Sequence, residues 1–203
     1  LQETKITMTM APPVLLRAAV DHFSNLSFDL PHLRIFICGG APVPYELLKA
    51  ASETMKFTTM VQGYGMTETS PIISFLNLRH ANKEKSSLAL LSSGKPLAGV
   101  ETKLCEKNVD GVGELAVRGP SIFSGYDNGT NEVQGLFEDG WFRTGDMASF
   151  DEDGYLHIVD RKKDMIITGG ENVYSKEVED VLIQHPKVNE VAVIGLPDEY
   201  WGC

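Results

Sequence analysis

Several features that mark secreted, membrane-spanning or zinc-binding proteins are missing from this sequence. It has 3 cysteines in 203 residues, and Cys38, Cys105 and Cys203 show no metal-type spacing. An odd, sparse set of cysteines gives no disulfide framework and favours a reducing compartment. We therefore expect an intracellular and most simply a cytoplasmic location, with an organelle as the alternative. No apolar run approaches about 18 residues, so no transmembrane segment is expected.

Positive charge is also scarce. The 18 Lys and Arg residues stand against 28 Asp and Glu residues, which gives a net charge of −10. Nucleic acids and anionic membranes bind basic surfaces, so neither is expected as a partner. A local basic pocket for a nucleotide is compatible with this balance. The sequence gives no indication of an oligomeric state.

The most informative stretch is the string Gln-Gly-Tyr-Gly-Met-Thr-Glu-Thr-Ser at residues 62–70. It follows an apolar, β-branched run at residues 57–61, which predicts a buried strand. The two glycines allow a backbone to pass close to a ligand, and Tyr64 between them offers a flat face to a planar ring. Thr67 and Glu68 place a hydroxyl beside a carboxylate, which suits a phosphate and its Mg²⁺. A Gly-x-Gly pattern alone is more often a turn after a core strand.

The residues before this string predict an α/β unit. We expect a helix at residues 13–20, a strand at 33–38 and a helix at 44–56, followed by the strand at 57–61. Residues 1–11 give no signal. Strand, helix and strand form a βαβ unit, in which ligands bind at the carboxyl ends of the strands. The apolar residues of the second helix fall on one face: Leu47, Leu48, Ala51 and Met55.

From residue 86 the pattern changes to short strands. They are predicted at 100–104, 113–118 and 155–159, with hairpin turns at Asp110-Gly111 and Asp153-Gly154. Short strands joined by tight turns predict a small barrel or a distorted sheet. The acidic residues 151–154 lack the spacing and late Glu of an EF-hand, so we expect a turn there rather than a calcium site.

The residues from 165 to 194 predict a separate, small α+β unit. We expect a strand at 165–167, a loop at 169–172, and a helix capped by Ser175 that runs to Gln184. The inner face of that helix would hold Val178, Val181 and Leu182. A further strand is expected at 188–194.

The string at 62–70 resembles the nucleotide-binding segment of the adenylate-forming superfamily, which includes acyl-CoA synthetases, luciferases and the adenylation domains of peptide synthetases. Other stretches agree in the same order, at residues 38–42, 113–119, 140–146, 160–164 and 169–172. The closest likeness is to AMP-forming acyl-CoA synthetases. Such an enzyme joins a small-molecule carboxylic acid to coenzyme A, using ATP and Mg²⁺.

The resemblance implies roles for particular residues. Nucleotide binding falls to Gly39, Gly40, Ala41, Gly63, Tyr64, Gly65, Met66, Thr67, Asp146 and Arg161. Thr67 and Glu68 are catalytic, Glu68 binds the metal, Lys163 is the hinge, and Gly169 and Gly170 line the coenzyme A tunnel. Without the resemblance, Asp146 after Thr-Gly at a strand end would be an ordinary turn, Arg161 a surface ion pair, and Lys163 part of a solvated charge run.

We therefore expect an α/β fold with two parts. Residues 1–160 would be the C-terminal part of a large AMP-binding domain, a βαβ sheet unit followed by a small barrel-like subdomain. Residues 161–203 would begin a small α+β domain. The family's upstream phosphate loop and its far C-terminal lysine have no counterpart here, so we expect an internal segment of a longer enzyme. A relative with another acceptor (luciferase-like or carrier-protein loading) and a non-catalytic truncated product are the alternatives.

The acyl substrate is not readable from the sequence. The residues expected to form part of its pocket are Gly40, Ala41, Met66 and the stretch 71–75.

Overall fold

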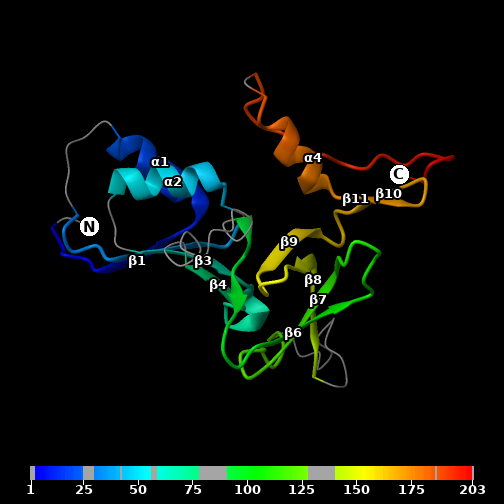
Figure 1. The fold of residues 1–203 in the computed structure, drawn as a ribbon, viewed down its shortest axis with the longest axis horizontal. Coiled ribbons are helices and arrows are strands. Elements are labelled where there is room, and N and C mark those ends of the chain that lie inside the picture. Colours follow the sequence, from blue (N-terminus) through cyan, green and yellow to red (C-terminus); the bar gives the residue numbers. More distant parts are fainter. Residues whose placement is uncertain are drawn as a thin grey trace.

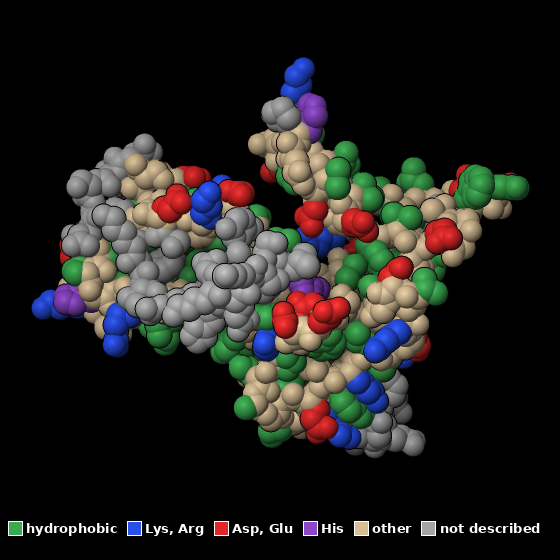
Figure 2. All heavy atoms as spheres, in the orientation of Figure 1, with side chains coloured by type: hydrophobic (Ala, Val, Ile, Leu, Met, Phe, Trp, Pro, Cys, Tyr) green, Lys and Arg blue, Asp and Glu red, His purple; other side chains and the backbone are tan. Residues whose placement is uncertain are grey.

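The computed structural model describes residues 3–24, 30–41, 43–55, 59–77, 91–127, 140–185 and 187–202. These residues form a five-stranded sheet, a four-stranded sheet and a two-stranded hairpin. In Figure 1 the helices α1 and α2 lie side by side on one face of the first sheet. Helix α4 and the C-terminal hairpin project away from it, beyond the second sheet (Figures 1 and 2).

The first sheet has a parallel half and an antiparallel half. Its strands, in order across the sheet, are β1 (Met8–Ala11), β2 (Ile35–Gly39), β3 (Thr59–Tyr64), β4 (Ser74–Asn77) and β5 (Lys95–Pro96). Strands β1, β2 and β3 are parallel, whereas β4 and β5 are antiparallel to their neighbours. The predicted βαβ unit is confirmed, and β1 adds a second one that the sequence did not indicate.

The helices α1 (Pro13–Phe23) and α2 (Tyr45–Met55) cover this sheet and form its core. The predicted inner face of α2 is confirmed, because Leu47, Leu48, Ala51 and Met55 are all buried. They belong to one cluster with Leu16 and Val20 of α1 and with Phe36, Cys38, Met60 and Leu76 of the sheet. Each large apolar side chain buried in this way contributes about 1.5–3 kcal/mol.

The thiols that the structure describes are free. Cys38 is buried and Cys105 is partly exposed, and neither forms a disulfide. Burial raises the pKa of the Cys38 thiol to about 11, so it stays neutral. We assign it to packing.

The second sheet is antiparallel, in the order β6 (Glu101–Cys105), β7 (Gly113–Arg118), β8 (Phe142–Phe150) and β9 (Leu156–Arg161). The predicted turns at Gly111 and Gly154 are confirmed, and both glycines have positive φ. Register shifts interrupt the β7–β8 and β8–β9 pairings. In the described part of the chain, β6 and β9 stand at the two edges, so these strands form a distorted open sheet and not a closed barrel.

One prediction about this sheet is wrong. Asp146 was expected at a strand end. It instead lies in the middle of β8, which continues to Phe150. Gly145 permits this because its φ of 74° lets the strand bend without ending.

The C-terminal part contains a hairpin and one helix. Strands β10 (Ile166–Thr168) and β11 (Glu171–Val173) pair around Gly169 and Gly170, and α4 spans Ser175–Leu182. The predicted loop at 169–172 is thus only a two-glycine turn, since Glu171 and Asn172 pair with β10.

Three other predictions for this part are wrong. Tyr174 occupies the helix cap position, and the Ser175 hydroxyl donates instead to Asp160. Val181 and Leu182 are 66% and 44% exposed, because no described element packs on that side of α4. The expected strand at 188–194 is irregular, as no described strand pairs with it. In the described residues no helix is both long and apolar enough to span a bilayer.

Candidate active site

The carboxyl ends of β2 and β3 lie side by side and are built from glycine. Gly39 is paired with Gly63 in the register of the two strands. A Cβ on Gly39 would lie 2.5 Å from the Gly63 carbonyl oxygen, so close strand packing requires this glycine. Gly40 follows with a φ of 86° and open space around it, and Ala41 beside it is exposed. This edge therefore offers accessible backbone to a ligand at residues 40–41.

The Gly-Tyr-Gly segment at residues 63–65 forms the end of a strand and the start of a fold-back. Strand β3 runs through Gly63 and Tyr64, and the chain then folds back along itself. The Ile73 amide donates to the Tyr64 carbonyl at 2.7 Å. A Cβ on Gly65 would lie 2.0 Å from the Pro71 carbonyl oxygen. Gly65 is thus required by this fold-back, whatever it contributes to a ligand.

A short helical turn, η1 (Thr67–Thr69), presents the next two predicted residues. Thr67 is exposed and Glu68 is partly exposed. The fully buried Thr69 fixes the turn, since its hydroxyl accepts the Met66 N–H at 3.1 Å and donates to the Met66 carbonyl at 2.9 Å. Our sequence analysis missed Thr69. A hydroxyl residue placed to bond a backbone three residues away is the signal that could have found it.

Two predicted nucleotide-binding residues, Tyr64 of β3 and Arg161 of β9, contact the carboxylate of a third, Asp146. Asp146 of β8 is 3% exposed. Its Oδ2 accepts the Tyr64 hydroxyl at 2.5 Å, and its Oδ1 accepts Arg161 Nε at 2.8 Å. Asp146 and Arg161 are direct partners in the β8–β9 register. The fold therefore assembles residues that are far apart in the sequence.

Burial and the neighbouring groups together set the pKa values of Asp146 and Tyr64. Burial raises the pKa of Asp146, while the hydrogen bond from Tyr64 and the charge of Arg161 act in the opposite direction. Burial and then the Asp146 charge raise the pKa of Tyr64 well above its usual range, so Tyr64 stays a donor. A carboxylate offers about four lone-pair sites. Asp146 therefore keeps capacity for hydroxyl donors from a ligand.

Thr144 holds Asp146 in place and was also missed. Its hydroxyl donates to the Leu115 carbonyl at 3.0 Å and accepts the Asp146 N–H at 3.1 Å. The first bond joins β8 to β7, and the second fixes the backbone beside the bend at Gly145. Thr144 lies in the Trp-Phe-Arg-Thr-Gly-Asp string, so its neighbourhood was recognised but its role was not.

The predicted hinge residue, Lys163, is exposed in the turn after β9. The residue before it is fixed on both sides. The Lys162 N–H donates to the Gly145 carbonyl at 2.8 Å, and its Nζ lies 2.8 Å from the buried Glu114. Glu114 also pairs with Arg143 at 2.6 Å. The turn at Lys163 thus starts from a rigid point.

Gly169 and Gly170 lie in the β10–β11 turn, with φ values of 59° and 87°. The Gly169 N–H donates to the Trp201 carbonyl at 2.9 Å, and the Trp201 ring packs against Gly169. The hairpin lies apart from β3 in Figure 1. This conformation therefore does not bring the two predicted coenzyme A residues to Tyr64 and Asp146.

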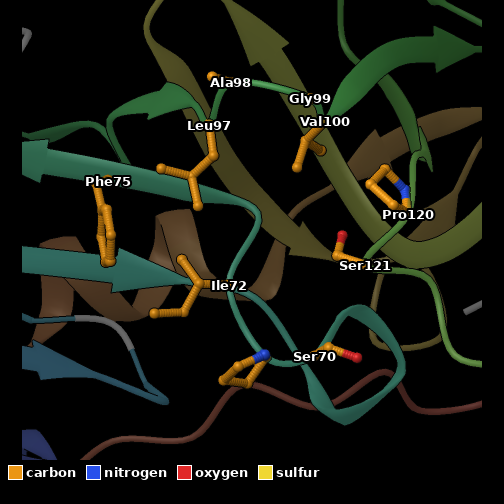
Figure 3. A pocket seen from close by; sticks show the side chains of 10 residues that line it. Ser70, Ile72, Phe75, Leu97, Ala98, Gly99, Val100, Pro120 and Ser121 are labelled. Carbon is orange, nitrogen blue, oxygen red and sulfur yellow. The ribbon is translucent and has the colours of Figure 1, made fainter.

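A cavity of about 280 Å³ lies beside the fold-back that follows η1 (Figure 3). Of the residues expected to line an acyl pocket, Pro71, Ile72 and Phe75 line it, whereas Gly40, Ala41 and Met66 do not. The rest of its wall is Ser70, Leu97, Ala98, Gly99, Val100, Pro120 and Ser121. Figure 3 shows Ile72, Leu97 and Val100 turned toward the same space, which makes the cavity largely apolar.

The oxygen donors at η1 suit a hard cation that is shared with a phosphate. Among the described residues there is no cluster of three or more His, Cys, Asp or Glu side chains for a metal. Mg²⁺ needs only one or two carboxylates when substrate phosphates supply other oxygens. Glu68 beside the exposed Thr67 hydroxyl fits that kind of site. Glu68 Oε1 accepts the hydroxyl of Tyr126, a contact that the sequence analysis also missed.

The chain that carries this βαβ sheet and the cluster of Tyr64, Asp146 and Arg161 belongs to the AMP-binding enzyme family. The family model described as AMP-binding enzyme matches residues 1–127, and the model of the AMP-binding enzyme C-terminal domain matches residues 177–203.

Proteins similar to this chain include enzymes that carry the names of CoA synthetases and of an amide bond synthetase. A feruloyl-CoA synthase of Amycolatopsis sp is 39% identical over 99% of this chain and 40% of its own length. The o-succinylbenzoate CoA synthetase of Bacillus subtilis, solved with its acyl-adenylate intermediate, is 36% identical with a TM-score of 0.81, over 98% of this chain and 40% of that one. The amide bond synthetase McbA of Marinactinospora thermotolerans is 36% identical with a TM-score of 0.83, over 99% and 41%. The chain thus spans about 40% of the length of these relatives.

Proposed function

We propose that the protein containing this chain is an AMP-forming acyl-CoA synthetase. The observation that carries the proposal is the convergence of Tyr64, Asp146 and Arg161 beside the glycine ends of β2 and β3. Two further proposals follow from the same family. Residues 1–160 belong to the large AMP-binding domain, and residues 161–203 begin the small one.

The nucleotide would bind along the carboxyl ends of β2 and β3. The two ribose hydroxyls would donate to Asp146, which keeps unused lone pairs in a buried setting. Tyr64 would lie beside the adenine ring, which would pack on the exposed backbone of Gly40 and Ala41. Arg161 is a permanently charged fork whose side chain is 56% exposed, so nitrogens other than the Nε paired with Asp146 would reach a ribose or phosphate oxygen.

In the first reaction a carboxylate oxygen of the acid attacks the α-phosphorus of ATP. The bond from that phosphorus to the bridging oxygen breaks, and pyrophosphate leaves with the electron pair. Thr67 would hold phosphate oxygens, and Glu68 would hold Mg²⁺. When bound, the cation neutralises charge on the transferring phosphate. Otherwise the residues act by positioning and by electrostatic stabilisation.

In the second reaction the thiolate sulfur of coenzyme A attacks the acyl carbon of the adenylate. The bond from that carbon to the phosphate oxygen breaks, and AMP leaves. This step requires Gly169 and Gly170 to approach the nucleotide residues, which they do not do in the present conformation. We infer that the part after Lys163 turns about that residue between the two reactions.

The acid would enter beside the fold-back after η1. The cavity there has Pro71, Ile72 and Phe75 in its wall, and its apolar lining suits the hydrocarbon part of a carboxylic acid. The apolar lining supports an aliphatic or aromatic carboxylic acid as the substrate class.

An alternative acceptor is favoured by one observation. The amide bond synthetase is as similar in structure as the CoA synthetase, with TM-scores of 0.83 and 0.81. Acyl-adenylate formation would be shared, and an amine or a carrier protein would take the place of coenzyme A. Only the second reaction separates these candidates.

The test measures acid-dependent pyrophosphate release by the complete protein, over a panel of carboxylic acids, with and without coenzyme A. We expect release with at least one acid, and a thioester product when coenzyme A is added. Asp146→Asn should weaken ATP binding, while the exposed-turn control Asp110→Asn should behave like the parent. Acid-dependent release without any thioester would favour the alternative acceptor. No release with any acid, from a folded protein, would contradict both candidates.

A further inference from the structure

Glu68 is held at its backbone and at its side chain by the segment that follows β7. The Phe123 N–H donates to the Glu68 carbonyl at 2.9 Å. The Tyr126 hydroxyl donates to Glu68 Oε1. The backbone carbonyl and the carboxylate of Glu68 are therefore each bonded by a segment far away in the sequence.

The segment is itself braced against the second sheet. The Phe123 ring meets the Tyr126 ring edge to face at 4.9 Å, and it meets the ring of buried Phe142 in the same manner at 5.9 Å. Aromatic pairs at these distances are favourable. Phe142 lies on β8, the strand that bears Asp146. Tyr126 thus links the position of Glu68 to the strand with the proposed ribose residue.

We propose that Tyr126 is a positioning residue for Glu68, holding Oε1 so that Oε2 is the oxygen presented to the cation of the bound nucleotide. This proposal rests on the proposed function. Oε2 has no hydrogen bond among the described residues, and Tyr126 contacts neither nucleotide nor acid in the scheme above. Without the hydroxyl, the flexible Glu side chain would have to be ordered by the cation itself, which weakens cation binding.

The protonation state of Tyr126 is compatible with this role. The hydrogen bond to Glu68 raises the pKa of the Tyr126 hydroxyl, because an ionised phenol would face a carboxylate. Tyr126 therefore remains a donor at neutral pH. Its side chain is 51% exposed, so we expect a moderate effect from its loss.

The experiment compares Tyr126→Phe with the parent in the complete protein, and uses Mg²⁺ with a non-hydrolysable ATP analogue as the probe. Calorimetry gives the Mg²⁺ concentration that half-saturates analogue binding. We expect Tyr126→Phe to raise it about three- to tenfold, with little change in analogue affinity in the absence of Mg²⁺. The matched control Ser124→Ala, an exposed residue of the same segment, should leave both values unchanged.

A double-mutant cycle with Glu68→Gln tests whether Tyr126 acts through Glu68. In the Glu68→Gln background, the Tyr126→Phe change should have no further effect on the Mg²⁺ requirement. The idea is overturned if Tyr126→Phe matches the parent, or if its effect persists unchanged in that background. Failure of the analogue to bind the folded parent at all would instead remove the proposed function, and this inference with it.

Discussion

Ser175 and Asp160 are hydrogen-bonded to each other across the turn that holds Lys163. The Ser175 hydroxyl donates to Asp160 Oδ2 at 2.8 Å, and both residues are buried. The Lys176 N–H also donates to Oδ2, at 3.3 Å. The first turn of α4 is thereby tied to the end of β9. A rotation of the C-terminal part about Lys163 has to break these bonds.

We therefore expect Ser175→Ala to loosen α4 in this conformation. Removing the hydroxyl leaves a buried Asp160 oxygen with one fewer donor, at a cost of about 1–2 kcal/mol to the contact. Hydrogen exchange of the α4 amides should become faster, while the amides of α2 stay protected. The control is Lys176→Ala, whose lost ion pair with Asp180 is exposed and worth about 0.3–0.5 kcal/mol. Equal exchange in the parent and Ser175→Ala would contradict this reading.

Replacing the proposed hinge residue, Lys163, should separate the two proposed reactions. Lys163→Pro restricts the backbone of the turn at residue 163 and at the residue before it. We expect acid-dependent pyrophosphate release to be largely retained, and thioester formation to fall at least tenfold, by about 1.4 kcal/mol in the barrier. Single-turnover assays of each reaction provide the measurement. Lys163→Ala keeps the backbone free and should retain both. Equal loss in both reactions would argue against a hinge at this residue.

The glycines of the β2–β3 edge should differ in their effect on folding. Gly39→Ala would place a methyl group against the Gly63 carbonyl, so the strands must separate, at a cost of about 1–3 kcal/mol. Gly40→Ala meets no atom and costs about 1 kcal/mol, because its φ is positive. Urea unfolding without nucleotide measures both. A Gly39→Ala protein as stable as the parent would show that this glycine is needed only for a ligand.

Ribose binding by Asp146 should depend on pH. Its pKa is raised by burial, so the carboxylate is protonated at a higher pH than an exposed aspartate. The affinity for a nucleoside should therefore fall on acidification at a higher pH than it would with an exposed aspartate. Adenosine is the suitable probe because a phosphate group itself titrates near pH 6. Asp146→Asn should bind weakly over the whole range, and a flat profile for the parent would count against a carboxylate ligand.

The βαβ unit formed by β2, α2 and β3 could be predicted from the sequence because its signals are local. Apolar spacing placed α2 and its inner face, and the runs before each glycine pair placed β2 and β3. The same logic failed on α4. Its periodicity showed that Val181 and Leu182 favour burial, but periodicity does not supply a neighbouring element, and the described residues contain none on that side.

Sequence reasoning proposed members of the candidate site but could not give its geometry. The family resemblance selected Asp146 and Arg161, yet their pairing follows from a strand register with a bulge that no local pattern encodes. Thr144 and Tyr126 each bond a residue that is distant in the sequence, Leu115 and Glu68. Such contacts appear only when the fold brings the partners together.

Lys162 anchors the turn that contains Lys163. Its amide is held by Gly145 and its ammonium by Glu114, so the residue before the pivot has little freedom. If the C-terminal part rotates about Lys163, the backbone dihedrals of that residue would set the direction of the rotation. Without the contacts of Lys162, the C-terminal part would still rotate but would not return to the same position each time. In the proposed rotation, the position that the C-terminal part reaches at the nucleotide would therefore depend on a residue that touches no ligand.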